Sequence, residues 1–346
     1  MSELFGKFCS FENLYSAYRK ARRGKRGKSS VAGFEYNQEQ GLIQLRDELL
    51  AGEWRPGKYT SFYIHEPKKR LISAAPFRDR VVHHALCNIL EPDWERRFIY
   101  DTYANRKGKG THRAVVRANE FAKKFRYVLQ CDVEQFFPSV DHAILREKIA
   151  AHVDDEKLMN IVDLILKSGI GVQAEEYQMK WFDDDDLFAA HRPRGLPIGN
   201  LTSQFWGNVY LSSFDHFVKR ELRAEGYVRY VDDFLLFGND KGILHEWKVK
   251  VILRLAKSRL ALHEPQVFPV ETGIPFLGFR IYPTHRRLKQ RRGIAFQRRF
   301  RRLYKAWLLG ESERSKLDDS ARSWAAHASW GDTYGLRQSV LGGFAL

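Results

Sequence analysis

The sequence is poor in the features that mark secreted and membrane-bound proteins. Three cysteines, Cys9, Cys87 and Cys131, are spread over 346 residues and form neither a paired framework nor a CxxC zinc motif. No apolar run approaches the roughly 20 residues that span a bilayer, and the first ten residues hold no signal-peptide core. We therefore expect a cytoplasmic protein with reduced cysteines and no membrane partner.

Negative charge is also scarce. The chain has 58 lysines and arginines against 42 aspartates and glutamates, which gives a formal net charge of +16 and a pI near 9.7. Because Lys and Arg neutralise phosphates and supply most non-specific affinity for nucleic acid, this surplus favours a polyanionic partner. The length predicts two or three subdomains with a substantial buried core.

The positive charge is concentrated in two segments. Residues 19–28 form an N-terminal basic segment interrupted by glycines, and residues 284–304 hold nine Arg or Lys among 21, interleaved with apolar anchors such as Phe296 and Phe300. A charge run is usually a solvated face, but these apolar anchors favour a helix that presents its cations to nucleic acid. The arginines expected to do so are Arg291, Arg292, Arg298, Arg299, Arg301 and Arg302.

Two short strings place aspartates at the tips of apolar, β-prone runs. The string Cys131-Asp132-Val133-Glu134-Gln135-Phe136-Phe137 follows one such run, and Tyr230-Val231-Asp232-Asp233 precedes another. Carboxylates at strand ends and turns can converge from distant parts of a chain. Their hard oxygens suit two Mg²⁺ ions that bridge a nucleoside triphosphate and an attacking hydroxyl. Taken alone, the second string fits a solvated hairpin tip equally well.

Further motifs surround these strings in a fixed order. They are Lys68–Ile72, Phe77–Val82, Arg106–His112, Gly195–Gln204 and Phe276–Phe279. Their order over residues 60–340 resembles a reverse transcriptase of the group II intron-like branch. The resemblance implies an α+β right-hand polymerase, with fingers, a palm whose antiparallel sheet carries helices on one face, and a helical thumb.

The resemblance also implies where these parts lie. An N-terminal basic helical region covers residues 1–55, the fingers 56–125, the palm 126–282 and the thumb 283–346. The palm includes an insertion at 169–194 and a primer grip at 276–279. Because nothing follows the thumb, we expect a polymerase core without a nuclease or integrase domain.

The same resemblance assigns a metal site. Asp132 and Asp232 would hold two Mg²⁺ ions, the backbone carbonyl of Val133 would add a ligand, and Asp233 would be a supporting carboxylate. Many polymerases of this type carry a lysine before the primer grip that is proposed to protonate the leaving pyrophosphate. The string Leu262–Val267 has none, although His263 is near.

A nucleotide site is implied as well. Lys69 and Arg70 would meet the triphosphate, and a generic surface cation in a hairpin is the alternative that the resemblance disfavours. Either Phe136 or Phe137 would lie against the sugar 2′ position and exclude ribonucleotides, and the sequence does not separate this role from core packing. The residues expected to border the nascent base pair are Ile198, Gly199 and Gln204.

The central motif indicates a subfamily. Most reverse transcriptases have Gln at the position of Ile198 and Pro at that of Gln204, and the version here is similar to that of diversity-generating retroelements. That resemblance implies an error-prone RNA-directed DNA polymerase that misreads template adenines while making cDNA from dNTPs. It also implies a template RNA, a cDNA primer and a small accessory protein. A group II intron, retron or antiviral-defence enzyme, or an inactive RNA-binding protein, remains an alternative.

Three simpler patterns predict local structure. Helical spacing places Leu42, Leu45, Leu49 and Leu50 in the core. The run Asp183–Asp186 should be a solvated acidic loop, because four adjacent acids cannot face one metal. A stripe from Trp324 through His327 and Trp330 to Thr333 should be core packing, with Gly331 ending the helix.

Overall fold

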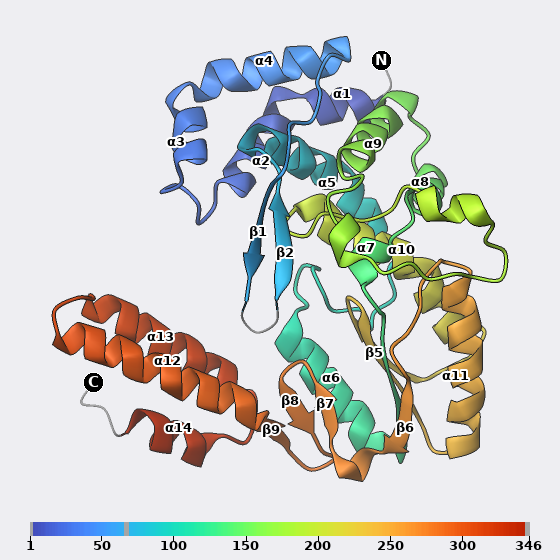
Figure 1. The fold of residues 1–346 in the computed structure, drawn as a ribbon, viewed down its shortest axis with the longest axis vertical. Coiled ribbons are helices and arrows are strands. Elements are labelled where there is room, and N and C mark those ends of the chain that lie inside the picture. The colour runs from blue at the N-terminus through green and yellow to red at the C-terminus, as the bar shows by residue number, and fades with distance from the viewer. Residues whose placement is uncertain (1–2, 66–68, 343–346) are drawn as a thin grey trace. The chain divides into compact units, whose positions relative to one another are not determined.

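The computed structural model describes residues 3–65 and 69–342 (Figure 1). Lys68, part of one predicted motif, lies outside these residues. The chain divides into two compact units, the first formed by residues 1–100, 132–221 and 250–263 and the second by 101–131, 222–249 and 264–346. In the described part of the chain, no helix is long and apolar enough to cross a membrane.

The first unit is mainly helical and contains one small hairpin. Its helices are α1 (Glu3–Cys9), α2 (Phe11–Ala21), α3 (Ser29–Tyr36), α4 (Gln38–Ala51), α5 (Phe77–Arg97), α7 (Phe136–Ser139), α8 (His142–Ala150), α9 (Glu156–Ser168) and α10 (Leu201–Arg220). Strands β1 (Thr60–Ile64) and β2 (Arg70–Ala74) pair antiparallel, with Ile64 opposite Arg70. This hairpin is the one predicted to carry Lys69 and Arg70.

Helix α5 is the centre of the first unit. It packs against α2 and α10, and its inward residues Val81, Val82, Ala85 and Leu86 are fully buried. Helix α10 is buried on most sides, which explains its long run of apolar and small residues. The core of this unit therefore anchors the motif that leads into α10.

Residues 1–55, expected to form an N-terminal helical region, contain the helices α1 to α4. Leu42, Leu45 and Leu49 of α4 are buried as predicted, whereas Leu50 is 37% exposed. The prediction for Leu50 was wrong because successive helical residues are about 100° apart. Leu50 therefore points away from the buried face of α4 that Leu42, Leu45 and Leu49 share.

The second unit combines two antiparallel sheets with four helices of its own. Its elements are α6 (Thr111–Lys124), β3 (Tyr127–Asp132), β4 (Gly226–Tyr230), β5 (Asp233–Gly238), β6 (Gln266–Pro269), β7 (Ile274–Phe276), β8 (Phe279–Ile281), β9 (Arg286–Leu288), α12 (Gln290–Leu308), α13 (Arg314–Ala328) and α14 (Tyr334–Leu341). The last residue of β3, Asp132, is assigned to the first unit. Helix α11 (Lys241–Ala256) begins in this unit and ends in the other. The predicted α+β class with antiparallel pairing is confirmed.

The larger sheet has the strand order β4-β5-β3-β6. Strands β4 and β5 form an antiparallel hairpin in which Tyr230 faces Asp233, and β3 pairs antiparallel with β6. Helix α6 packs on β4 and β5, where Val115, Ala118 and Phe121 join one hydrophobic core. The sheet therefore brings together strands from three separate stretches of sequence.

Gly226 starts the hairpin because a side chain has no room there. A Cβ atom at this position would lie 2.7 Å from Phe237 Cβ and 2.9 Å from Phe125 Cε2. We expect Gly226→Ala to lower the free energy of unfolding by about 1–3 kcal/mol through overpacking, as measured by denaturant titration. Gly335→Ala in α14 is the matched control. A methyl group there would meet no atom within 4 Å, so it should stabilise by up to about 1 kcal/mol.

The C-terminal segment predicted as a helical thumb begins with a strand. Residues Arg286–Leu288 form β9 and pair with β8, so the helices start only at Gln290. The predicted stripe does not run along one helix, because α13 ends at Ala328. His112 Nε2 lies 2.9 Å from His327 Nδ1, and the His112 ring stacks on Trp330 with centroids 4.8 Å apart.

The acidic run in the insertion is not simply solvated. The Asp185 side chain is fully buried and forms an ion pair with Arg192, and Arg259 NH1 lies 2.9 Å from its Oδ1. Asp184 also pairs with Arg259, and Asp186 accepts a hydrogen bond from Ala189 N–H. The prediction missed this network because one of its arginines, Arg259, is distant in sequence.

Candidate active site

Asp132 is the last residue of β3. Burial alternates along this strand, with Val128, Leu129 and Cys131 in the core, and Asp132 itself is half-buried. The Asp132 carbonyl accepts a hydrogen bond from His263 N–H at 3.0 Å, and Glu134 N–H donates to the Ala261 carbonyl at 2.9 Å. These bonds form an isolated bridge between Val133 and Leu262. The Val133 carbonyl takes part in neither of the two bonds, which is consistent with the role predicted for it.

Asp232 lies in the turn between β4 and β5, and Asp233 is the first residue of β5. Both side chains are half-buried. The preceding Val231 has a φ angle of +58°, which is unusual for a β-branched residue and indicates a constrained turn. The predicted hairpin with an aspartate at its tip is therefore confirmed.

The donor atoms in these motifs suit Mg²⁺ better than softer metals. Asp132 and Asp232 offer carboxylate oxygens and Val133 a carbonyl oxygen, the hard ligands that Mg²⁺ prefers alongside water and phosphate. In the described residues, no group of three or more His, Cys, Asp or Glu side chains is placed to hold a metal.

The two phenylalanines after Asp132 are in different environments. Phe136 is only 2% exposed and packs on α10, where a Cβ atom at Gly207 would lie 3.1 Å from its ring. Phe137 is half-buried, and the two rings lie 5.2 Å apart. Phe136 is therefore a core residue, and Phe137 is the more accessible of the two residues for which a nucleotide contact was predicted.

The segment Gly195–Gln204 is attached to the β1–β2 hairpin. Ser73 N–H donates to the Ile198 carbonyl at 2.8 Å, and the buried Asn200 side chain donates to the Ser73 carbonyl and accepts from Ala75 N–H. Gly199 has a φ angle of +117°, and a Cβ atom there would lie 2.9 Å from Ile72 Cγ2. The structure thus brings the predicted residues of the central motif beside β2.

The nucleotide-site candidates on these two elements have accessible side chains. Lys69, Arg70 and Gln204 are exposed and Ile198 is half-buried. Lys69 Nζ lies 4.2 Å from the centroid of the Tyr63 ring, which orients it by a cation–π contact. Asn200, which links the two elements, was missed by the sequence analysis. Its position directly before a helix was the available signal.

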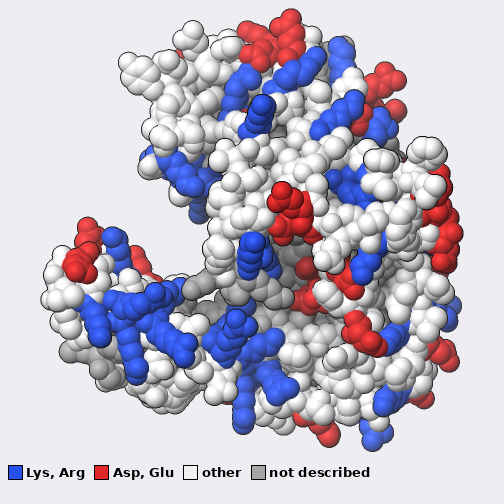
Figure 2. All heavy atoms as spheres, in the orientation of Figure 1, with Lys and Arg blue, Asp and Glu red and all other residues white. Residues whose placement is uncertain are grey.

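The six arginines predicted to bind nucleic acid lie on α12, and all are exposed. Figure 2 shows Lys and Arg side chains gathered over this helix. Phe296 and Phe300 hold its other face in the core. Arg292 differs from the rest, because its guanidinium covers the primer-grip turn so closely that a Cβ atom at Gly278 would clash with it. Arg292 therefore contacts the predicted primer grip directly.

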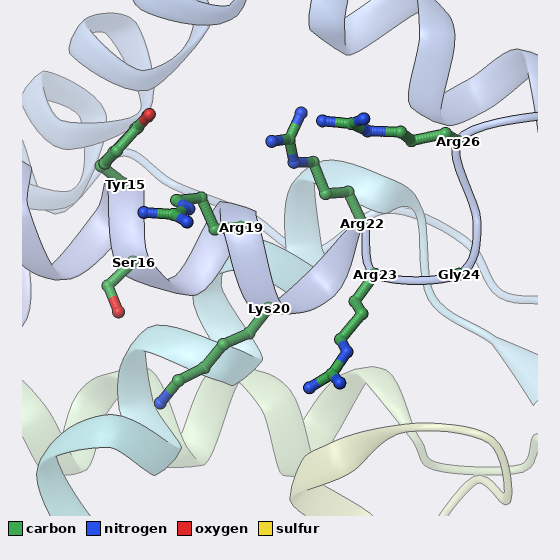
Figure 3. Close-up of a pocket in the computed structure, with 8 residues that line it drawn as sticks. All are labelled: Tyr15, Ser16, Arg19, Lys20, Arg22, Arg23, Gly24 and Arg26. Atoms are coloured by element: carbon green, nitrogen blue, oxygen red, sulfur yellow. The ribbon is translucent and has the colours of Figure 1, made fainter.

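The N-terminal basic segment forms an open pocket of about 670 Å³. Figure 3 shows cationic side chains from α2 and the following loop around it. Arg22 forms an ion pair with Glu35, and Glu35 has its pKa lowered mainly by that hydrogen bond. Arg22 thus has a structural partner, and the other cations of the pocket are Arg19, Lys20, Arg23 and Arg26.

Comparisons with known proteins identify the family. The family model described as "Reverse transcriptase (RNA-dependent DNA polymerase)" matches residues 64–281, well over half of the chain. The chain belongs to the reverse transcriptase family. Its class of activity is therefore RNA-directed DNA polymerisation.

Similar proteins include one encoded by a group II intron. The chain is 25% identical to Protein YkfC of Escherichia coli over 294 residues, and this alignment covers 72% of this chain and 74% of that protein. It is 24% identical over 270 residues to the group II intron-encoded protein LtrA of Lactococcus lactis, covering 74% of this chain but only 42% of LtrA. An apo telomerase structure from Candida tropicalis matches with a TM-score of 0.45 and 12% identity, over 66% of this chain and 48% of that one. The chain is therefore a reverse transcriptase with sequence similarity to a group II intron-encoded protein.

Proposed function

We propose that this reverse transcriptase copies a template RNA into error-prone cDNA for a diversity-generating retroelement, with Asp132 and Asp232 as its metal ligands. The observation that carries the catalytic part is the strand order. Strand β3 ends in Asp132, and its neighbour β5 begins directly after Asp232. Carboxylates on adjacent strands of one sheet are well suited to share a pair of ions.

The proposed reaction is attack of a primer 3′-hydroxyl on the α-phosphate of a dNTP. Two bound Mg²⁺ ions would lower the pKa of that hydroxyl and neutralise the leaving pyrophosphate. Asp132, Asp232 and the Val133 carbonyl would hold the ions, and Asp233 would support them. No lysine lies near Gln266 in the sequence, and His263, whose Nδ1 is 3.8 Å from Glu134 Oε1 with a side chain 63% exposed, is the nearest candidate acid.

Nucleotide selection is proposed for the first unit. Lys69 and Arg70 would meet the triphosphate from the β1–β2 hairpin, Ile198, Gly199 and Gln204 would border the base pair, and Phe137 would exclude ribonucleotides. The support is the attachment of the Ile198 carbonyl and the Asn200 side chain to β2. Because these two elements are joined, the residues that contact the triphosphate and those that contact the base can bind one nucleotide in a fixed relative position.

The proposed nucleic-acid surfaces are the outer face of α12 and the N-terminal pocket. Both are rich in exposed arginines, as expected for contacts to template RNA and to the cDNA primer and product. A small accessory protein of the retroelement would bind the basic surface, and the proposed location is the cytoplasm. The similarity to LtrA leaves a group II intron role as the alternative.

The retroelement role rests on Ile198 and Gln204, at positions where most reverse transcriptases have Gln and Pro. An amide at position 198 can hydrogen-bond to the nucleotide, whereas isoleucine offers only apolar contact. The absence of such a hydrogen bond costs about 1–3 kcal/mol, which corresponds to roughly tenfold to hundredfold less discrimination. The half-buried side chain of Ile198 is accessible enough for this apolar contact.

We expect Ile198→Gln and Ile198→Asn to lower misincorporation opposite template adenine relative to the other three bases. The measurement is sequencing of cDNA made by each enzyme on one RNA template. Leu201→Gln, at another half-buried position three residues later, is the matched control and should leave the error pattern unchanged. An identical error spectrum at measurable activity would exclude Ile198 as a fidelity determinant.

A genomic observation separates the two biological roles. A diversity-generating retroelement would be flanked by two near-identical repeats that differ at adenines, whereas a group II intron enzyme would lie within an intron. A primer-extension assay on RNA separates either from an inactive RNA-binding protein, because only an enzyme lengthens the primer.

A further inference from the structure

Arg229 is a fully buried arginine in the strand that leads to the proposed metal site. It lies in β4 and is only 1% exposed. Burial of a permanently charged guanidinium is costly unless its donors are satisfied. The groups that the Arg229 guanidinium contacts therefore bear directly on its role.

The guanidinium of Arg229 holds the turn that carries Asp232. Its NH1 donates a hydrogen bond to the Val231 carbonyl at 2.9 Å. The Arg229 backbone is itself fixed, because its N–H donates to the Asp101 carbonyl and its carbonyl accepts from Tyr103 N–H, both at 3.0 Å. A rigidly placed donor thus points at the residue directly before Asp232.

Val231 is the residue of this turn whose backbone conformation is strained. Its φ of +58° is a left-handed conformation that strains a β-branched residue and persists only where the surroundings impose it. The turn could relax by rotation about the N–Cα bond of Val231, and that rotation would move the Val231 carbonyl relative to β4. A charged hydrogen bond to this carbonyl opposes the rotation.

We propose that Arg229 is a positioning residue, which fixes the direction of the Asp232 carboxylate by holding the strained Val231 turn. This inference rests on the proposed role of Asp232 as a metal ligand. A second contact supports it, since Thr111 Oγ1 donates to Tyr230 Oη at 3.0 Å and so restrains the residue before Val231. Partners that orient a ligand in this way typically change metal affinity or activity by about 10- to 100-fold when they are removed.

The test is Arg229→Met, which keeps much of the buried volume and removes the donor. We expect a kcat about 10- to 100-fold lower and a higher Mg²⁺ concentration for half-maximal primer extension, with RNA affinity unchanged. Arg229→Lys, which retains one donor, should recover part of both losses. Arg126→Lys, at an exposed position just before β3, is the control. An unchanged Mg²⁺ requirement in Arg229→Met would overturn the proposal, whatever its thermal stability.

Changes at Val231 keep the test informative if Arg229→Met fails to fold. Val231→Pro fixes φ near −65° and should abolish incorporation while RNA binding remains, whereas wild-type activity would overturn the proposal. Val231→Gly removes the strain, so the Arg229→Lys defect should shrink in this background, and an undiminished defect would also overturn the proposal.

Asp232→Asn separates the metal-ligand role of Asp232 from the positioning role of Arg229. Activity in Asp232→Asn would refute the metal-ligand role. An inactive Asp232→Asn together with normal activity and a normal Mg²⁺ requirement in Arg229→Met would refute only the positioning role.

Discussion

Asp132→Asn and Asp232→Asn are each expected to reduce dNTP incorporation to background while RNA binding stays within about twofold of wild type. The amide keeps the size of the side chain but removes the negative charge that a Mg²⁺ ligand supplies. The basic surfaces that bind RNA are left intact. Primer extension and equilibrium RNA binding, measured on the same purified proteins, check both parts of this expectation.

Asp154→Asn is the matched control for this pair. Asp154 is exposed and lies outside the proposed site, so its substitution should leave incorporation unchanged. Asp233→Asn should give an intermediate loss, because Asp233 is proposed to support the ions rather than to bind them directly. Near-normal extension by either Asp132→Asn or Asp232→Asn would refute the proposed mechanism.

Neutralising the outer face of α12 should produce the second largest effect. Changing Arg291, Arg298, Arg299, Arg301 and Arg302 together to Gln should weaken RNA binding roughly 100-fold near physiological salt. The decrease should be the same for all RNA sequences, because phosphate contacts carry no base information. The slope of log affinity against log salt should also fall, by about one unit for each phosphate that an arginine no longer neutralises.

Arg292 is left out of this set because it packs on the primer-grip turn, so its removal would mix binding with positioning. The control changes Arg314, Lys316 and Arg322 of α13 to Gln, since these residues are exposed on a neighbouring helix. Their neutralisation should alter the salt slope little. An unchanged slope in the α12 variant would show that its arginines face solvent or a protein partner.

Local patterns in the sequence predicted the elements that carry the candidate site. An apolar run ending in Asp132 became β3, and the residues around Asp232 became a hairpin, because strand alternation and turn position depend on neighbours in sequence. Burial separated Phe136 from Phe137, which the sequence could not do. Both are aromatic, and only the packing of α10 decides which one is covered.

The features that the sequence did not reveal depend on distant partners. The buried pair of Asp185 with Arg259 and the link from Asn200 to β2 join residues far apart in the chain. Arg229 is a lone arginine in an apolar strand, and the role proposed for it depends on the left-handed conformation of Val231 two residues later. Sequence patterns thus favoured surface positions for polar residues, whereas several of these residues are buried and contact distant segments of the chain.

Single-nucleotide incorporation on an RNA template tests the central proposal most directly. The purified chain would be given a primed RNA whose next template base is adenine, with Mg²⁺ and one dNTP at a time. The proposal predicts extension with dTTP and measurable extension with the other three dNTPs, with misincorporation faster opposite adenine than opposite any other template base. No extension with any dNTP would contradict polymerase activity in this chain, and extension with dTTP alone would contradict the retroelement role.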